Sequence, residues 1–166
     1  MEKETKSEGV CKMKSSGRYA KKLNRKRVLI CMLLFFALLP VFSYLHEAGH
    51  ALVCAADGNE SEITVGIDGG TTLCHGEVSN IFAYKISGGL LAGVVGIAAG
   101  IGLFRWKIPF IVLTTLGAGH LINAGIETFA DSYFTSAVEW STFLGLVEFV
   151  IFLTLLLIFD RRKVYV

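Results

Sequence analysis

Long apolar segments separated by short polar ones dominate this chain. Residues 28–45 form a run of 18 residues without a charged side chain, and the apolar character continues to about residue 54. Further apolar segments cover residues 86–104, 108–130 and 137–159. A helix rises about 1.5 Å per residue, so each segment is long enough to cross the ~30 Å hydrocarbon layer of a bilayer. The pattern predicts four transmembrane helices.

A polar segment, residues 57–85, separates the first and second apolar segments. Within it Ile63, Val65 and Ile67 alternate with polar residues and are followed by Asp68-Gly69-Gly70. Alternation with a period of two is typical of a strand, and an Asp-Gly pair favours a tight hairpin turn. We therefore predict an all-α membrane protein with four transmembrane helices and a short β-hairpin between the first and the second.

The composition agrees with a membrane protein and excludes an ordinary soluble domain. Hydrophobic residues make up 53% of the 166 residues, charged residues 18%, and the mean hydropathy is +0.58. The predicted organisation is a basic, disordered cytoplasmic segment at residues 1–27, a polytopic membrane domain at 28–160 and a basic tail at 161–166. A cleaved signal peptide is the alternative for the first apolar segment, but its length exceeds the usual apolar region of about 7–15 residues.

The basic residues are unevenly distributed along the chain. Residues 1–27 hold 10 of the 16 Lys and Arg against 3 acidic residues. If all four helices span the membrane, 15 of the 16 basic residues fall on one side and Lys85 alone falls on the other. The excess of basic residues on cytoplasmic loops then predicts a multi-pass protein of the cell membrane with both termini cytoplasmic and the hairpin outside. The expected contact of the basic segment is the lipid bilayer, not nucleic acid.

The most specific motif is His46-Glu47-Ala48-Gly49-His50, an HExxH sequence near the end of the first apolar segment. On a helix His46 and His50 lie one turn apart on the same face, so both imidazoles can bind one zinc ion. Glu47 can then reach the water on that ion. Random placement of the chain's own His and Glu would give about 0.006 such motifs. Polar residues at membrane depth are costly unless paired or metal-bound, which favours a metal site over two hydrogen-bonded histidines.

A catalytic zinc site takes a third protein ligand, and the third apolar segment offers four polar residues on one helical face: His120, Asn123, Glu127 and Asp131. The first and third helices run in the same direction, so Asp131 approaches the side of the two motif histidines. We predict Asp131 as the third ligand, with Glu127 as an alternative ligand or as a hydrogen-bond partner of a ligand histidine. His120 is a further alternative, but it lies about 16 Å from Asp131 along the helix, too far for a ligand unless the helix breaks, and a hydrogen bond across the bundle is its expected role.

Other polar residues leave alternatives open. Cys54 and Cys74 fall on the predicted outer side, where an oxidising compartment allows a disulfide, but two free thiols are equally compatible with the spacing. Cys54 also continues the face of the two motif histidines by one turn, which suits either a thiolate ligand or a small packing residue. Glu148 lies midway along the fourth apolar segment, where structural pairing is favoured over catalysis.

With these residues the chain resembles the site-2 protease family of intramembrane zinc metalloproteases. In that family HExxH lies on a transmembrane helix, and a later helix carries the pattern N-x-x-P-x-x-x-x-D-G, whose Asp is the third zinc ligand. Asn123 and Asp131 keep that spacing of eight, although Ile126 replaces the Pro and Ser132 replaces the Gly. The resemblance implies cleavage of a peptide bond in or beside the membrane.

Two further features bear on that resemblance. The glycine-rich segment 87–93 is similar to the family's small-residue helix between the two ligand-bearing helices, and small residues there allow close helix packing. The well-known members of the family place the zinc toward the cytosol, whereas the basic residues here put the motif on the outer side. Either the site or the topology is inverted relative to the family.

Together these residues predict an enzyme, an intramembrane zinc metalloprotease with one zinc ion per chain held by His46, His50 and Asp131. Glu47 would activate the zinc-bound water, and the substrate would be a membrane-anchored protein or peptide. The alternative is a non-catalytic membrane zinc-binding or transport protein that uses the same ligands. A transporter does not need a non-ligating carboxylate beside the metal, so Glu47 discriminates between the two. A diiron lipid hydroxylase would need many more histidines than the 4 present.

Overall fold

The computed structural model describes residues 25–66, 69–130 and 137–161. These residues form four helices, α1 (Arg25–Ala56), α2 (Ile81–Gly102), α3 (Lys107–Phe129) and α4 (Ala137–Arg161), and one hairpin of the strands β1 (Ser61–Gly66) and β2 (Gly69–Cys74). All four helices are long and apolar enough to cross a membrane. The prediction of a helical membrane protein with a hairpin between its first and second helices is confirmed.

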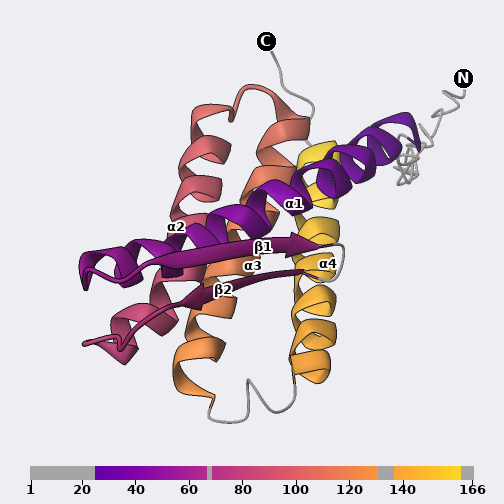
Figure 1. The fold of residues 1–166 in the computed structure, drawn as a ribbon. Coiled ribbons are helices and arrows are strands. Elements are labelled where there is room, and N and C mark those ends of the chain that lie inside the picture. Colours follow the sequence, from indigo (N-terminus) through magenta and orange to yellow (C-terminus); the bar gives the residue numbers. More distant parts are fainter. Residues whose placement is uncertain (1–24, 67–68, 131–136, 162–166) are drawn as a thin grey trace, which may run out of the picture.

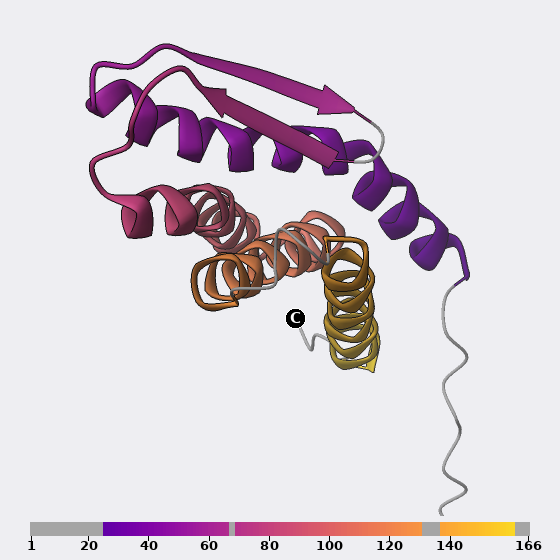
Figure 2. The same ribbon diagram turned by 60° about the horizontal axis from the view of Figure 1, so that its bottom comes forward.

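Helix α1 has a different direction from the other helices. Helices α2, α3 and α4 run side by side, each antiparallel to the one before it, while α1 crosses them obliquely (Figure 1). The hairpin runs alongside α1, on the side facing away from the other three helices (Figure 2). Helix α1 therefore has protein contacts on two faces, one toward the helical bundle and one toward the hairpin.

The ends of the helices around the hairpin are set by local signals. Helix α1 stops at Ala56, and Gly58 adopts a positive φ of 79° that most other residues avoid. Helix α2 begins at Ile81, earlier than the apolar pattern predicts, because the side chain of Asn80 accepts a hydrogen bond of 2.9 Å from the backbone N–H of Ala83. The helix therefore includes Lys85, whereas the sequence pattern predicts that Lys85 belongs to the polar segment before the helix.

The hairpin has the antiparallel register expected for a tight turn. Ser61 pairs with Cys74 at one end and Gly66 pairs with Gly69 at the other, while the predicted Ile67 and Asp68 lie outside the described residues. The side chains alternate between exposed and half-buried along both strands, with Ile63 and Val65 half-buried on β1. One face of the hairpin therefore packs on α1, as the alternating pattern predicts.

Small residues allow α2 and α3 to pack closely. A Cβ added to Gly96 on α2 would lie only 2.7 Å from the Cα of Gly117 on α3. Neither glycine could be replaced without moving the helices apart, as expected for small residues at a helix interface in lipid. The apolar core next to this interface draws on all four helices and contains Cys31, Phe42, Ala92, Phe110, Ile111, Val112, Leu116, Phe152 and Leu156.

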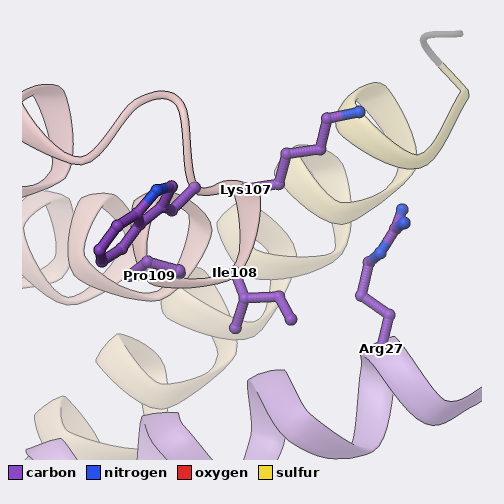
Figure 3. Close-up of a pocket in the computed structure, with 5 residues that line it drawn as sticks. Arg27, Lys107, Ile108 and Pro109 are labelled. Carbon is purple, nitrogen blue, oxygen red and sulfur yellow. The ribbon is translucent and has the colours of Figure 1, made fainter. Parts of the chain in front are cut away.

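The end of the bundle where α1 and α3 begin is basic. Arg27, Trp106 and Lys107 border a shallow pocket there, together with Ile108 and Pro109 (Figure 3). Basic residues and Trp at the ends of apolar helices are typical of the boundary between lipid and water. The opposite end of the bundle, where α2 begins and α3 ends, carries the HExxH motif.

Candidate metal centre

The two histidines of the HExxH motif are buried where α1 faces α2 and α3. His46 is 7% exposed and His50 is 4% exposed. Their spacing of one helical turn brings the two Nε2 atoms to 3.1 Å from each other. The local helix alone therefore directs two nitrogen ligands to one point.

Glu127 of α3 completes a group of three possible ligands. Its Oε2 lies 3.3 Å from His46 Nε2, and its Oε1 lies 3.5 Å from His50 Nε2. Four-coordinate zinc with ligand bonds of about 2.0–2.1 Å would hold its ligand atoms about 3.3 Å apart, which agrees with these separations. His46, His50 and Glu127 can therefore hold one metal ion.

The burial of Glu127 supports the same conclusion. The residue is 6% exposed, and its Oε2 has no hydrogen-bond partner among the described residues. A carboxylate in an apolar environment is costly unless a cation or a hydrogen-bond donor compensates it. The neighbouring imidazoles are cations only when protonated, and a divalent ion between the three side chains would compensate the carboxylate while the imidazoles stay neutral. The donor set and its charge thus fit a metal ion.

Each histidine is oriented through its other ring nitrogen. His50 Nδ1 donates a hydrogen bond of 2.7 Å to the backbone carbonyl of Tyr84 on α2, because a carbonyl can only accept. His46 Nδ1 lies 3.4 Å from Nδ1 of His120 on α3, and the ring of His120 stacks on Phe42. A proton on Nδ1 leaves the lone pair of Nε2 available for a metal. Both contacts therefore direct the Nε2 atoms toward Glu127.

Helix α2 presents no side chain to the metal centre at Gly88. A Cβ added there would lie 2.8 Å from His46 Nε2 and closer still to His50 Nε2. On the other side of this contact, a Cβ added to Gly49 would lie 2.8 Å from the Cα of Gly88. Glycine at these two positions lets α1 and α2 approach each other, and no side chain of α2 at position 88 contacts the two Nε2 atoms.

Glu47 lies on a neighbouring face of α1, beneath the hairpin, and is 7% exposed. Thr72 Oγ1 on β2 lies 2.8 Å from Glu47 Oε2 and 2.9 Å from its backbone carbonyl oxygen. A Cβ added to Gly70 would lie 2.5 Å from Glu47 Cγ, so the backbone of β2 rests directly on this side chain. Glu47 is thus adjacent in sequence to a possible ligand, but its carboxylate is held by the hairpin.

A disulfide joins Cys54 near the end of α1 to Cys74 at the end of β2. Of the two alternatives that the sequence allows, a disulfide or two free thiols, the structure contains the disulfide. It also removes Cys54 from the possible metal ligands, because a disulfide sulfur is not a thiolate. The disulfide attaches the hairpin to α1 about one turn beyond His50.

The other predicted residues have different outcomes. Asp131 lies outside the described residues, so its role as third ligand stays a prediction, and the structure brings Glu127 to the two histidines. The distance predicted for His120 is measured from Asp131, on the assumption that the motif histidines meet the third helix there. Since α1 crosses α3 obliquely, His120 instead reaches His46, in the kind of hydrogen bond across the bundle that the sequence predicted for it.

Sequence reasoning did not identify Thr72 or Tyr84. Thr72 could have been found, because strand alternation puts it on the same face as Gly70 and Cys74. Tyr84 contacts His50 through its backbone carbonyl, which any residue type would supply, so no sequence signal marks it.

Glu148 of α4 packs against α3 at Gly119. A Cβ added to Gly119 on α3 would lie 2.5 Å from Glu148 Cγ, so the side chain packs against the α3 backbone. The structural pairing that the sequence favours for Glu148 stays a prediction.

Comparison with known proteins finds no relative of this chain. No protein-family model, no curated protein and no solved structure matches it.

Proposed function

We propose that this protein is an intramembrane zinc metalloprotease of the site-2 protease type. The observation that carries the proposal is the convergence of His46, His50 and Glu127 at one buried point, with the buried Glu47 next to His46 in the sequence. Two histidines and one carboxylate are a ligand set used by catalytic zinc, which leaves a position open for reaction. The helices that supply these residues are long and apolar enough to cross a membrane.

Zinc, when bound, would supply Lewis acidity that activates water near neutral pH and polarises a substrate carbonyl. Glu47 is the residue that moves the proton. Its carboxylate accepts a proton from the attacking water and then donates that proton to the amide nitrogen as the peptide bond breaks, so that the products are a carboxylic acid and an amine. His46, His50 and Glu127 take no part in this transfer because their role is to hold the ion.

The substrate class follows from the location of the site. A peptide bond is accessible to attack only where the backbone is extended, because a helix hides its carbonyl groups. The substrate is therefore a membrane-anchored protein or peptide with an extended segment near its membrane boundary. The hairpin beside Glu47 has unpaired outer edges in the described structure, and such an edge can bind an extended segment by adding a strand.

A non-catalytic membrane protein that binds or transports zinc is the second candidate. The triad alone is compatible with it. Glu47 favours hydrolysis, because a buried carboxylate that follows a ligand in the sequence but does not join the triad is not needed for simple metal binding.

We further propose that the metal centre faces the outside of the cell. The disulfide between Cys54 and Cys74 supports this, because disulfides persist in oxidising compartments and are rare in the cytosol. A cysteine at Thr64, introduced with the disulfide intact and the other native cysteines replaced, should react with an impermeant maleimide in intact cells. A cysteine at Ser15 should react only after lysis. The reverse labelling pattern would place the site in the cytosol.

The substitution Glu47→Gln tests the enzymatic proposal. The amide can still accept hydrogen bonds but cannot take a proton, so zinc content should stay near that of the wild type while cleavage is lost. Glu62→Gln on the exposed side of the hairpin is the matched control and should cleave normally. The assay mixes each variant with a library of tagged single-span peptides in lipid vesicles and measures the cleavage products. Cleavage by Glu47→Gln at the wild-type rate would refute the proposed role.

A further inference from the structure

The half-buried face of β2 contacts one face of α1 at two places along the helix. Gly70, Thr72 and Cys74 alternate along the strand and are its half-buried residues. Gly70 and Thr72 both contact Glu47, and Cys74 is bonded to Cys54, which lies two helical turns beyond Glu47. The hairpin is therefore fixed to α1 at the glutamate of the motif and again beyond the motif.

The contact between Thr72 and Glu47 is a specific hydrogen bond. The single hydroxyl proton of Thr72 can be donated to only one of the two nearby Glu47 oxygens, and the carboxylate at 2.8 Å is the stronger acceptor. Glu47 is 7% exposed, so little bulk water competes with this donor. Thr72 thus restricts the direction in which the carboxylate points.

Tyr84 connects this hydrogen bond to the metal ligands. Its hydroxyl donates to the backbone carbonyl of Thr72 at 3.3 Å, and its own carbonyl accepts from His50 Nδ1 at 2.7 Å. Tyr84 therefore forms hydrogen bonds with both Thr72 and His50 and restrains the position of one relative to the other.

The disulfide protects this register. Antiparallel strands can slip by two residues without changing which face is buried, and such a slip moves each residue by about 6.6 Å. That distance would take Thr72 out of reach of Glu47. The bond from Cys74 to Cys54 prevents the movement, because Cys74 is only two residues beyond Thr72 on the same face.

We infer that Thr72 is a positioning residue for the general base Glu47, and that the Cys54–Cys74 disulfide holds it in place. The catalytic role of Glu47 comes from the proposed function, so this inference rests on it. The hairpin is then part of the active site and not only a possible docking edge for substrate.

The first test needs no substrate. Thermal unfolding is measured for the full chain in lipid nanodiscs as the wild type, Glu47→Ala, Thr72→Val and the double variant. If the hydrogen bond exists, the two substitutions should be non-additive by about 2–4 °C in Tm. Thr71→Val, on the exposed face of β2, is the matched control and should be additive with Glu47→Ala. Additive behaviour of Thr72→Val would overturn the inference.

The second test uses the library peptide that the wild type cleaves fastest. Thr72→Val should lower kcat by about 10- to 100-fold with KM changed less than about twofold, because a misplaced catalytic group costs rate more than binding. Zinc content should be unchanged. Thr72→Ser keeps the hydroxyl and should restore most of the rate, which a merely structural loss would not predict. A Thr72→Val variant with normal kcat would refute the inference.

The third test addresses the disulfide and also separates this inference from the proposed function. Replacing both Cys54 and Cys74 by Ser should increase hydrogen exchange at the amides of β2 and lower kcat, while zinc is retained. Unchanged exchange and unchanged kcat would exclude the role of the disulfide. If Glu47→Gln proves active, the proposed function fails, whereas a normal Thr72→Val beside an inactive Glu47→Gln removes only the positioning role.

Discussion

Replacing Gly88 by alanine should destroy the metal centre without touching a ligand. The new Cβ would lie 2.8 Å from His46 Nε2, whereas relaxed contacts between heavy atoms lie at about 3.5 Å or more, so the overlap is about 0.7 Å. Ligand positions in a metal site tolerate deviations of only about 0.2 Å. The imidazoles cannot easily turn away, because their Nδ1 atoms are held by Tyr84 and His120.

The expected loss is at least about 100-fold in zinc affinity, or about 2.7 kcal/mol, and overpacking should cost a further ~1–3 kcal/mol of stability. Zinc affinity is measured by competition with a chelator, and zinc-dependent stabilisation by thermal unfolding. Gly125→Ala on α3 is the control, since a Cβ there meets no atom within 4 Å and should leave affinity unchanged. Zinc binding by Gly88→Ala at wild-type affinity would refute the assignment of the metal to these histidines.

Three other predictions follow from the site and its surroundings. Glu127→Gln should lower zinc affinity more than Asp131→Asn does, and metal analysis showing the opposite order would favour the ligand predicted from the motif spacing. His120→Leu should weaken zinc binding by about 10- to 100-fold, as measured by chelator competition, since it removes the contact that orients a ligand histidine. The hydroxyl and backbone N–H of Ser79 donate to Asp57 at 2.6 and 2.9 Å and lower its pKa. The stability from this pair is present above the ordinary pKa of Asp near ~4 and is lost as pH falls through the lowered pKa. NMR titration should show Ser79→Ala raising the pKa of Asp57, and an unchanged value would contradict this.

The sequence was sufficient to predict the helices and the hairpin because both have strong periodic signals. An uncharged run such as residues 28–45 has few alternatives to a membrane-spanning helix. The motif histidines were predictable for the same reason, since their convergence depends only on the geometry of one helical turn. The start of α2 at Ile81 was not predictable from the apolar pattern, because the helix begins where the side chain of Asn80 caps it.

Contacts between elements could not be predicted in the same way. The choice between carboxylates on α3 depends on how far along α3 the crossing of α1 falls, and the crossing angle is set by packing at glycines such as Gly49 and Gly88. Taking Asp131 as the residue that meets the motif histidines put His120 about 16 Å away, whereas His120 contacts His46 directly. The hydrogen bond from Thr72 to Glu47 also required the hairpin to be docked, which no local pattern specifies.

The oblique course of α1 makes bilayer thickness relevant to the chemistry of the site. With 32 residues, α1 is about 48 Å long, longer than a hydrocarbon layer of ~30 Å, and a helix of excess length fits such a layer by tilting, by kinking or by thickening the bilayer locally. A thinner bilayer demands more tilt and a thicker one less. The candidate metal centre lies between α1 and the pair formed by α2 and α3, so a change in the tilt of α1 relative to α3 would alter the separation of His46 and His50 from Glu127. Where bilayer thickness changes the angle between α1 and α3, the acyl-chain length of the surrounding lipid becomes a variable of the candidate metal centre.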